Sequence, residues 1–188
     1  MMTMSEEKFV VVAIDPQNDF LDIEGASLPV PGSSMDMRRL ARFISVIAAK
    51  ISRIIITLDT HRVVHIAHTT GWVNADGISV DKKGMIPISH QDTLDGKYVW
   101  TIDPEWGRIY TRLMEASAPG SCHYLWPDHC VVGTWGHAIF PELADAIHAW
   151  ERECGGLRGA EYIQKGANPK TEHFGAFGAQ VAIEGEPD

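Results

Sequence analysis

Two runs of β-branched residues constrain the fold of this chain more than any other feature. Residues 9–14 (FVVVAI) precede Asp15, and residues 53–58 (RIIITL) precede Asp59. Between the two runs, apolar residues recur at helical spacing over residues 37–51. Runs without alternation are typical of strands that are buried on both faces in the middle of a parallel sheet. The order strand, helix, strand predicts a right-handed βαβ unit with parallel strands.

Two further helices and a third strand are predicted downstream. One helix opens at Asp103 and ends before Pro119, and the other opens at Pro141 and stops at Gly155. A short strand over residues 160–164 ends at Lys165. The residues predicted to face inward are Trp106, Ile109, Tyr110 and Leu113 in the first of these helices, and Leu143, Ala146, Ile147 and Trp150 in the second.

Other stretches give weaker signals. Residues 69–121 contain glycines, prolines and charges with little periodicity, so apart from the helix at Asp103 they predict an inserted loop with one short strand. Residues 180–183 (QVAI) also predict a short strand. Ser33 or Ser34 is the expected N-cap of the first helix.

Composition limits the classes of partner. The chain has 188 residues, which we expect to form a single domain over residues 1–188. Its net charge of -9 argues against nucleic acid and against anionic membranes as partners. The N-terminus is not typical of a secretory signal, and no apolar run reaches membrane-spanning length. Three cysteines without a CxxC motif indicate a reduced, cytoplasmic protein.

The three predicted strands each end on a charged residue. These residues are Asp15, Asp59 and Lys165. In open α/β sheets, ligands bind at the carboxyl ends of the strands. We therefore expect the three side chains to converge on one crevice.

The segment Asp59-Thr60-His61 predicts part of a metal site. In extended backbone, residues i and i+2 point to the same side, so a carboxylate and an imidazole can bind one cation. A mixed nitrogen and oxygen ligand set suits zinc, iron or manganese better than calcium. Catalytic sites typically use three protein ligands, so a third is expected. The candidates for it are His65, His68, His90, His123, His129 and His137.

Four blocks of this sequence, in order, resemble the isochorismatase-like cysteine hydrolases, and most of all their nicotinamidase branch. The blocks are DPQNDFLD with GASLPVPG (residues 15–32), TLDTHRVVHIAH (57–68), WPDHC with VVGTWGHAIFPEL (126–143) and KGANPKTEHFGAF (165–177). The resemblance implies an α/β fold with a three-layer α/β/α, Rossmann-like parallel sheet. It also implies an amidohydrolase that converts a small pyridine-type carboxamide to the acid and ammonia. Relatives commonly assemble into dimers or tetramers, so a homo-oligomer is expected.

The resemblance implies roles for individual residues. Asp15 and Lys165 match two members of the family's Asp-Lys-Cys catalytic triad. Asp59, His61 and His129 match its three ligands for a divalent metal, which holds the pyridine nitrogen of the substrate and which we expect to be zinc, with iron or manganese as alternatives.

Further residues are assigned in the same way. His65 matches a histidine near the metal site in some members, and Phe20 and Trp126 match aromatics on either side of the substrate ring. Cys130 lies beside a metal ligand and is expected to be buried and inert. The remaining histidines are assigned as structural or surface residues, namely His68, His90, His123, His137, His148 and His173.

The sequence departs from the family at the nucleophile. The family's catalytic cysteine lies well downstream of its lysine, whereas no cysteine follows Cys154 in this chain. The C-terminal part of the family domain is therefore expected to be absent, as in a fragment, a non-catalytic relative that only binds ligand or assembles, or one half of a site that another polypeptide completes. A metal-dependent hydrolase that uses water instead of a thiol is the alternative enzyme. Without later strands, residues 9–14 would form an open apolar edge, so we expect the isolated chain to be unstable or to pair with another copy.

Overall fold

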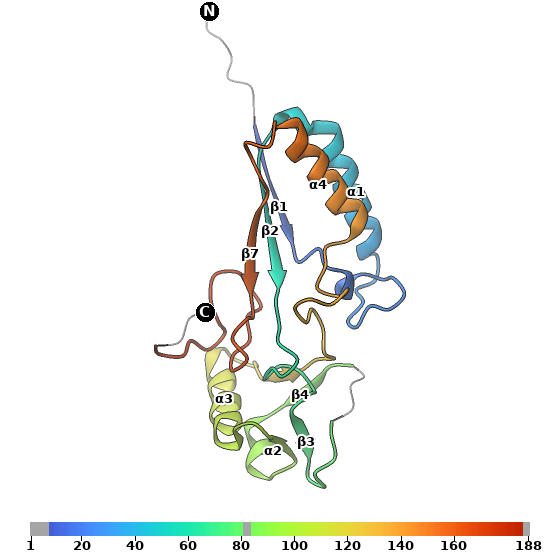
Figure 1. The fold of residues 1–188 in the computed structure, drawn as a ribbon. Helices are drawn as coiled ribbons and strands as arrows, with labels where there is room; N and C mark the ends of the chain where they lie inside the picture. The colour runs from blue at the N-terminus through green and yellow to red at the C-terminus, as the bar shows by residue number, and fades with distance from the viewer. Residues whose placement is uncertain (1–7, 81–83, 186–188) are drawn as a thin grey trace, which may run out of the picture.

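The chain is built around a three-stranded parallel sheet (Figure 1). The computed structural model describes residues 8–80 and 84–185. Residues 1–7, on which the exclusion of a secretory signal partly rests, lie outside the described residues, as do residues 81–83 of the insertion and residues 186–188. The sheet has the strand order β1 (Phe9–Ile14), β2 (Ile51–Asp59) and β7 (Glu161–Lys165). This arrangement confirms the predicted α/β class and the parallel pairing of the first two strands.

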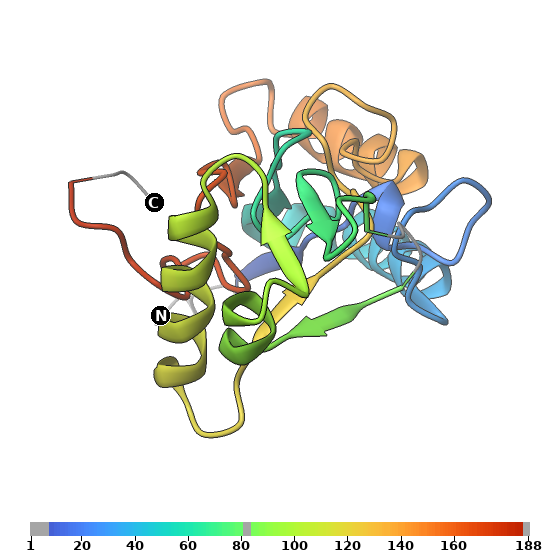
Figure 2. The same ribbon diagram turned by 90° about the horizontal axis from the view of Figure 1, so that it is seen from below.

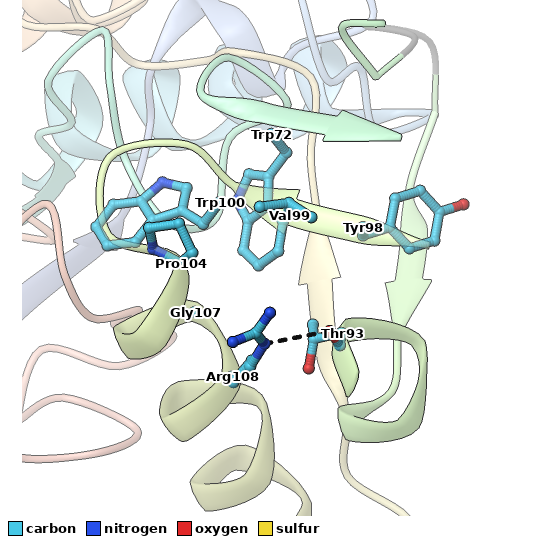
Figure 3. Close-up of a pocket in the computed structure, with 8 residues that line it drawn as sticks. All are labelled: Trp72, Thr93, Tyr98, Val99, Trp100, Pro104, Gly107 and Arg108. Atoms are coloured by element: carbon cyan, nitrogen blue, oxygen red, sulfur yellow. Dashed lines mark hydrogen bonds between the residues drawn. The ribbon is translucent and has the colours of Figure 1, made fainter. Parts of the chain in front are cut away.

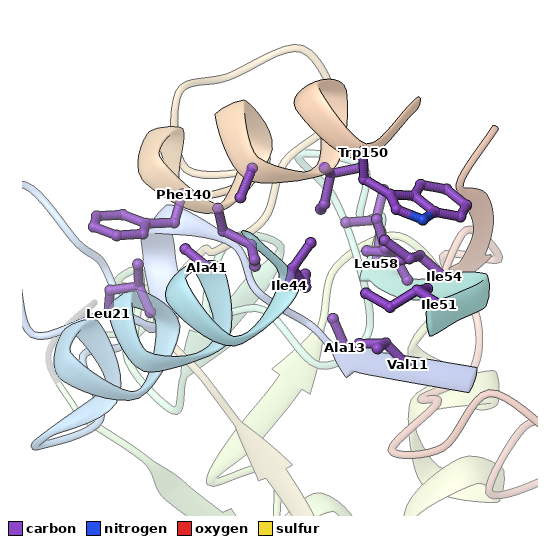
Figure 4. Packing of buried hydrophobic residues seen from close by; sticks show 14 residues of the cluster. Val11, Ala13, Leu21, Ala41, Ile44, Ile51, Ile54, Leu58, Phe140 and Trp150 are labelled. Atoms are coloured by element: carbon purple, nitrogen blue, oxygen red, sulfur yellow. The ribbon is translucent and has the colours of Figure 1, made fainter. Parts of the chain in front are cut away.

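Two helices cover one face of this sheet (Figure 4). They are α1 (Ser33–Ile47), which a 3-10 turn (Ala48–Lys50) follows, and α4 (Pro141–Glu153). Their apolar sides pack on alternate residues of β1 and β2 and form the main hydrophobic core. The inward face predicted for α4 is confirmed, because its buried residues are Leu143, Ala146, Ile147 and Trp150.

The other face of β1 contradicts the prediction from its sequence. Val11 and Ala13 are buried against the helices, but Val10, Val12 and Ile14 are 53%, 54% and 71% exposed. Successive side chains of a strand point to opposite faces, and among the described residues β1 pairs only with β2 and is covered on one face. The strand is therefore an edge strand with one open apolar face, and not a strand buried on both sides.

The start of α1 also differs from the prediction. The N-cap is Gly32, whose φ of 84° lies in the left-handed region, while Ser33 and Ser34 are already helical. The carboxylate of Asp22 accepts hydrogen bonds from the backbone N–H groups of Gly32 and Ser34, both at 2.8 Å. A side chain from outside the helix thus satisfies the N–H groups that a serine N-cap would otherwise satisfy.

Residues 69–121 are more ordered than their sequence predicts (Figures 1 and 2). Two antiparallel pairs form, β3 (Trp72–Asn74) with β5 (Tyr98–Trp100), and β4 (Ile86–Ile88) with β6 (His123–Leu125). Two helices, α2 (His90–Leu94) and α3 (Pro104–Ser117), pack beside them around a second hydrophobic core.

Two local predictions need correction. The fully buried face of α3 consists of Gly107, Tyr110, Thr111 and Met114, so of the predicted stripe only Tyr110 is fully buried. Residues 180–183, predicted as a strand, are irregular. None of the described helices has the length and apolar character needed to span a membrane.

Candidate functional site

The three charged strand ends meet at the carboxyl edge of the parallel sheet. The Lys165 ammonium nitrogen lies 3.0 Å from Oδ2 of Asp15 and 2.5 Å from Oδ1 of Asp59. β2 and β7 pair Asp59 directly with Lys165, which brings the two side chains together. Burial lowers the pKa of Lys165, but the negative charges of Asp59 and Asp15 outweigh it and hold that pKa above its ordinary value. The predicted convergence of these residues is confirmed.

Asp15 is held in a strained backbone conformation. Its φ is 45°, which is uncommon for a residue other than glycine and costs about 1–3 kcal/mol. Thr57, on the neighbouring strand, donates its hydroxyl to Oδ1 of Asp15 at 2.7 Å and accepts the Asp15 N–H at 3.1 Å. The carboxylate is thus fixed between a hydroxyl and an ammonium, with its side chain 17% exposed.

Two buried histidines adjoin the other oxygen of Asp59. Nε2 of His61 and Nε2 of His129 lie 3.5 and 3.6 Å from Oδ2 of Asp59, which are ion-pair distances too long for good hydrogen bonds. Nδ1 of His61 lies 3.1 Å from the Gly166 carbonyl, and Nδ1 of His129 lies 2.8 Å from the Pro127 carbonyl. A carbonyl oxygen only accepts, so each Nδ1 carries a proton, and in the neutral ring Nε2 offers its lone pair toward Asp59.

His68 and His65 complete a cluster of buried imidazoles, each 0% exposed. The ring centroid of His68 lies 4.8 Å from that of His61 and 5.0 Å from that of His129. Burial and these two neighbours lower the pKa of His68 to about 3, so its ring is neutral. The ring of His65 lies 4.4 Å from that of His61, but its Nδ1 already accepts the Ala67 N–H at 3.2 Å.

The cluster fits a divalent metal. Ligand atoms of His61, His68 and His129 lie within 4.8 Å of one another, and all three residues are buried. Among the described residues, Nε2 of His61 and both ring nitrogens of His68 have no hydrogen-bond partner. Metal-bound histidines characteristically donate their second ring N–H to a carbonyl, as His61 and His129 do here. His68, assigned from sequence to a structural or surface role, therefore belongs to the candidate metal centre.

A cleft of about 210 Å³ opens beside these groups. The predicted site residues that line it are Asp15, Phe20, Asp59, Trp126, His129 and Lys165. Leu28, Glu172, His173 and Phe174 also line it and were not predicted as site residues. His61 and His65 are not among the lining residues and lie behind this wall, so contact of His65 with a substrate stays a prediction.

None of the three cysteines lines this cleft in the part of the chain that the structure describes. Cys130 is 0% exposed, and burial together with the charges of Asp59 and Asp19 raises the pKa of its thiol far above the ordinary value. The prediction that Cys130 is buried is confirmed. Asp15 and Phe20 also border a second, apolar cavity of about 250 Å³, on the side of Ile14 and Met37.

Glycine and amide contacts hold the loops that form the site. Gly166 has a φ of 73°, and a Cβ there would lie 2.6 Å from a carbon of the His61 ring, so a larger residue would displace the imidazole. The side chain of Gln17 donates to the Asp59 carbonyl and accepts the Asp59 N–H, both at 2.7 Å. The Cys130 N–H donates to the buried carboxylate of Asp19 at 2.7 Å, which fixes the turn after His129.

Comparison with known proteins identifies the fold. No protein-family model and no curated protein sequence matches the chain. The structure of the yeast nicotinamidase bound to the inhibitor nicotinaldehyde matches with a TM-score of 0.56 and 20% identity over 90% of this chain. A nicotinamidase-pyrazinamidase from Acinetobacter baumannii matches with a TM-score of 0.51 and 18% identity over 95% of this chain. The chain spans 62% of the yeast enzyme and 60% of the Acinetobacter enzyme. The chain therefore shares the fold of these nicotinamidase structures, as its sequence blocks predicted.

Proposed function

We propose that this chain forms the metal-binding and substrate-binding part of an amidohydrolase for a small pyridine-type carboxamide. The observation that carries this proposal is the presence of two groups of residues at one cleft. The Asp15–Lys165 pair lines the cleft, and the histidine cluster adjoins this pair through Asp59. The nicotinamidase fold supports the same class of reaction.

The metal would be held by His61, His129 and His68, with Asp59 as a carboxylate ligand. The first two imidazoles have Nδ1 bonded to a carbonyl, which leaves Nε2 for a metal, and the burial of His68 keeps its ring neutral and able to coordinate. Histidine nitrogens with one carboxylate favour zinc, with iron or manganese as alternatives. When bound, such an ion would act as a Lewis acid that holds the ring nitrogen of the substrate.

The cleft is shaped for a flat ring. Phe20, Trp126 and Phe174 supply aromatic walls, and Asp15, Asp59 and Lys165 supply charged groups. Most small-molecule sites combine an apolar wall with a few placed polar groups, because the wall binds the ligand and the polar groups orient it. We infer that the ring lies between the aromatic side chains with its carboxamide toward Asp15 and Lys165.

Asp15 would act as the general base and Lys165 would stabilise the charges that form. The nucleophile of this chemistry is a thiol that is not among the described cleft residues. Asp15 accepts the thiol proton, the sulfur attacks the carbonyl carbon, and ammonia leaves with that proton. Water then hydrolyses the thioester to the acid and regenerates the thiol. We infer that such a thiol would enter from the apolar cavity that Asp15 and Ile14 line.

The test is release of ammonia from nicotinamide by the metal-loaded native protein. Asp15→Asn is expected to lower kcat at least about a hundredfold while zinc stays bound, because a general base contributes about that much. Asp76→Asn, on an exposed residue of the insertion, is the matched control. Equal rates for both variants would exclude Asp15 as the base.

A metal-dependent hydrolase that uses water is the second candidate. It is favoured by the fact that a histidine cluster adjoins the cleft while none of the described cysteines lines it. The two candidates differ in their inhibitors. Loss of activity on chelation but not on thiol alkylation supports the water-dependent enzyme, whereas loss on both supports the thiol-dependent amidohydrolase.

A further inference from the structure

Helix α3 of the insertion contacts the segment that follows β7 through two side chains. The indole N–H of Trp106 donates to the Lys170 carbonyl at 2.9 Å, and the Tyr110 hydroxyl accepts the Glu172 N–H at 2.8 Å. Tyr110 is 0% exposed, so its hydroxyl and the Glu172 amide meet inside the protein. Trp106 and Tyr110 lie one helical turn apart on the same face of α3. Their two hydrogen bonds reach Lys170 and Glu172, which are alternate residues of the segment.

The segment held in this way is one wall of the cleft. Glu172, His173 and Phe174 line the cleft, and Glu172 is 5% exposed. The segment contains no helix or strand, and the Glu172 carbonyl accepts the Gln180 N–H at 2.8 Å. A backbone stretch without a regular hydrogen-bond ladder is positioned by its few individual contacts, and those from α3 hold its buried amide.

Helix α3 itself packs tightly against the rest of the insertion (Figure 3). A Cβ at Gly107 would lie 3.0 Å from Cβ of Trp100 and 3.5 Å from the ring of Trp72, so the helix backbone packs directly against these two residues. The hollow between them and Arg108 has no room for a water molecule, so it is a packing seam and not a ligand site. Contact this close leaves α3 little freedom to shift against β3 and β5.

The same core also holds the loop of the histidine cluster. The carbonyl of Ile66, between His65 and His68, accepts the Trp72 indole N–H at 2.8 Å and lies 2.9 Å from Nε2 of His123. The Ile66 N–H donates to the Pro169 carbonyl at 2.8 Å. The insertion therefore joins the loop beside the metal centre to the loop that forms the cleft wall.

We infer that the insertion is a fixed support for the cleft, in which Tyr110 and Trp106 are positioning residues for the Glu172–Phe174 wall. The effect on ligand binding rests on the proposed function, whereas the positioning itself does not. Neither side chain is among the residues that line the cleft, so both act through the segment they hold. This role differs from that of a mobile lid, because a lid would require the packing between α3 and residues Trp72 and Trp100 to open.

Tyr110→Phe in the metal-loaded native protein tests the inference. This variant removes the acceptor of the Glu172 N–H and keeps the ring in the second core. Amide hydrogen exchange at Glu172 is expected to rise roughly tenfold, as loss of one buried hydrogen bond predicts, while exchange in β2 and α3 stays unchanged. Affinity for nicotinamide is expected to fall by a similar factor, and zinc affinity to stay the same. Tyr98→Phe is the matched control, because that hydroxyl points away from the seam in Figure 3.

Trp106→Phe provides a second variant at a partly exposed position, in case Tyr110→Phe unfolds the protein. It removes only the bond to the Lys170 carbonyl and is expected to raise exchange over residues 170–173 by a smaller factor. Unchanged exchange in both variants would overturn the positioning role. Raised exchange with unaltered nicotinamide affinity would overturn the link to the cleft. If the wild-type protein fails to bind nicotinamide, the proposed function is wrong, and the exchange data still decide the role of the insertion.

Discussion

Gly136→Ala should lower the free energy of unfolding by more than the addition of a single methyl group suggests. Gly136 has an ordinary φ, so alanine brings no backbone penalty there. A Cβ at Gly136 would, however, come closer than 3.0 Å to the carboxyl carbon and both carboxylate oxygens of Asp19. Asp19 is 5% exposed, so the carboxylate has no open solvent into which to move. The added methyl group must therefore displace either Asp19 or the turn that contains Gly136.

The cost follows from what Asp19 holds. Its carboxylate accepts the Cys130 N–H at 2.7 Å and the Ser27 N–H at 3.1 Å. Hydrogen bonds to charged groups contribute about 1.5–3 kcal/mol each, so loss of both costs about 3–6 kcal/mol. That is a large part of the total stability of about 5–15 kcal/mol expected for a domain. Because Cys130 follows His129, zinc affinity should fall as well.

Urea denaturation monitored by tryptophan fluorescence measures this cost, with an unchanged m-value as the sign of an intact native state. Gly159→Ala is the matched control, since the nearest atom to its Cβ would be the flexible Glu151 carboxylate at 3.6 Å. In an Asp19→Ala background, Gly136→Ala should cost no more than about 1 kcal/mol, because the clash is gone. If Gly136→Ala lowers the free energy of unfolding of the otherwise wild-type protein by less than about 1 kcal/mol, the reasoning is refuted.

Four further outcomes are expected. His68→Ala should weaken zinc binding at least about tenfold by competition titration, because it removes a ligand. Lys165→Met should cost about 3–5 kcal/mol in urea denaturation, because it leaves the buried Asp59 carboxylate without its cation, whereas Lys97→Met, in an exposed pair, should cost less than about 1 kcal/mol. Burial raises the pKa of Glu172 above its ordinary value of 4.5. The free-energy cost of burying the charged carboxylate is therefore fully present above the folded-state pKa and absent below 4.5. Glu172→Gln should accordingly stabilise the metal-free protein at pH 7 but not at pH 4. Val12→Lys should reduce self-association of the 188-residue chain in sedimentation velocity, because it places a charge on the open apolar face.

The cluster of charged residues at the carboxyl edge of the sheet could be predicted because it depends on local sequence and one general rule. β1 and β2 are each marked by a β-branched run, β7 by a shorter strand signal, and the residue that ends each of these segments must lie at the carboxyl edge. The structure pairs Asp59 with Lys165 across β2 and β7, and Asp15 follows β1 next to them. The sequence distance of 106 residues between Asp59 and Lys165 did not matter, because parallel pairing alone brings them together.

The histidine cluster and the insertion could be predicted only in part. HRVVHIAH places three histidines in eight residues, which signals a site but not which imidazoles have free ring nitrogens. That choice depends on tertiary contacts, such as the Gly166 carbonyl that lies 3.1 Å from Nδ1 of His61. Strands of three residues, as in β3 and β5, are too short to show a period, so of the second core only helix α3 left a pattern in the sequence.

The exposed face of β1, which the sequence did not predict, lies next to the proposed reaction site. A β-branched run shows that both faces of a strand are apolar, but it does not show what covers them. Val12 and Ile14 are open to solvent, and soluble proteins rarely leave such a strand edge uncovered. Ile14 also borders the apolar cavity that Asp15 and Phe20 share with the cleft. An element that covers Ile14 and fills this cavity would lie beside Asp15, which is where the proposed reaction requires a thiol.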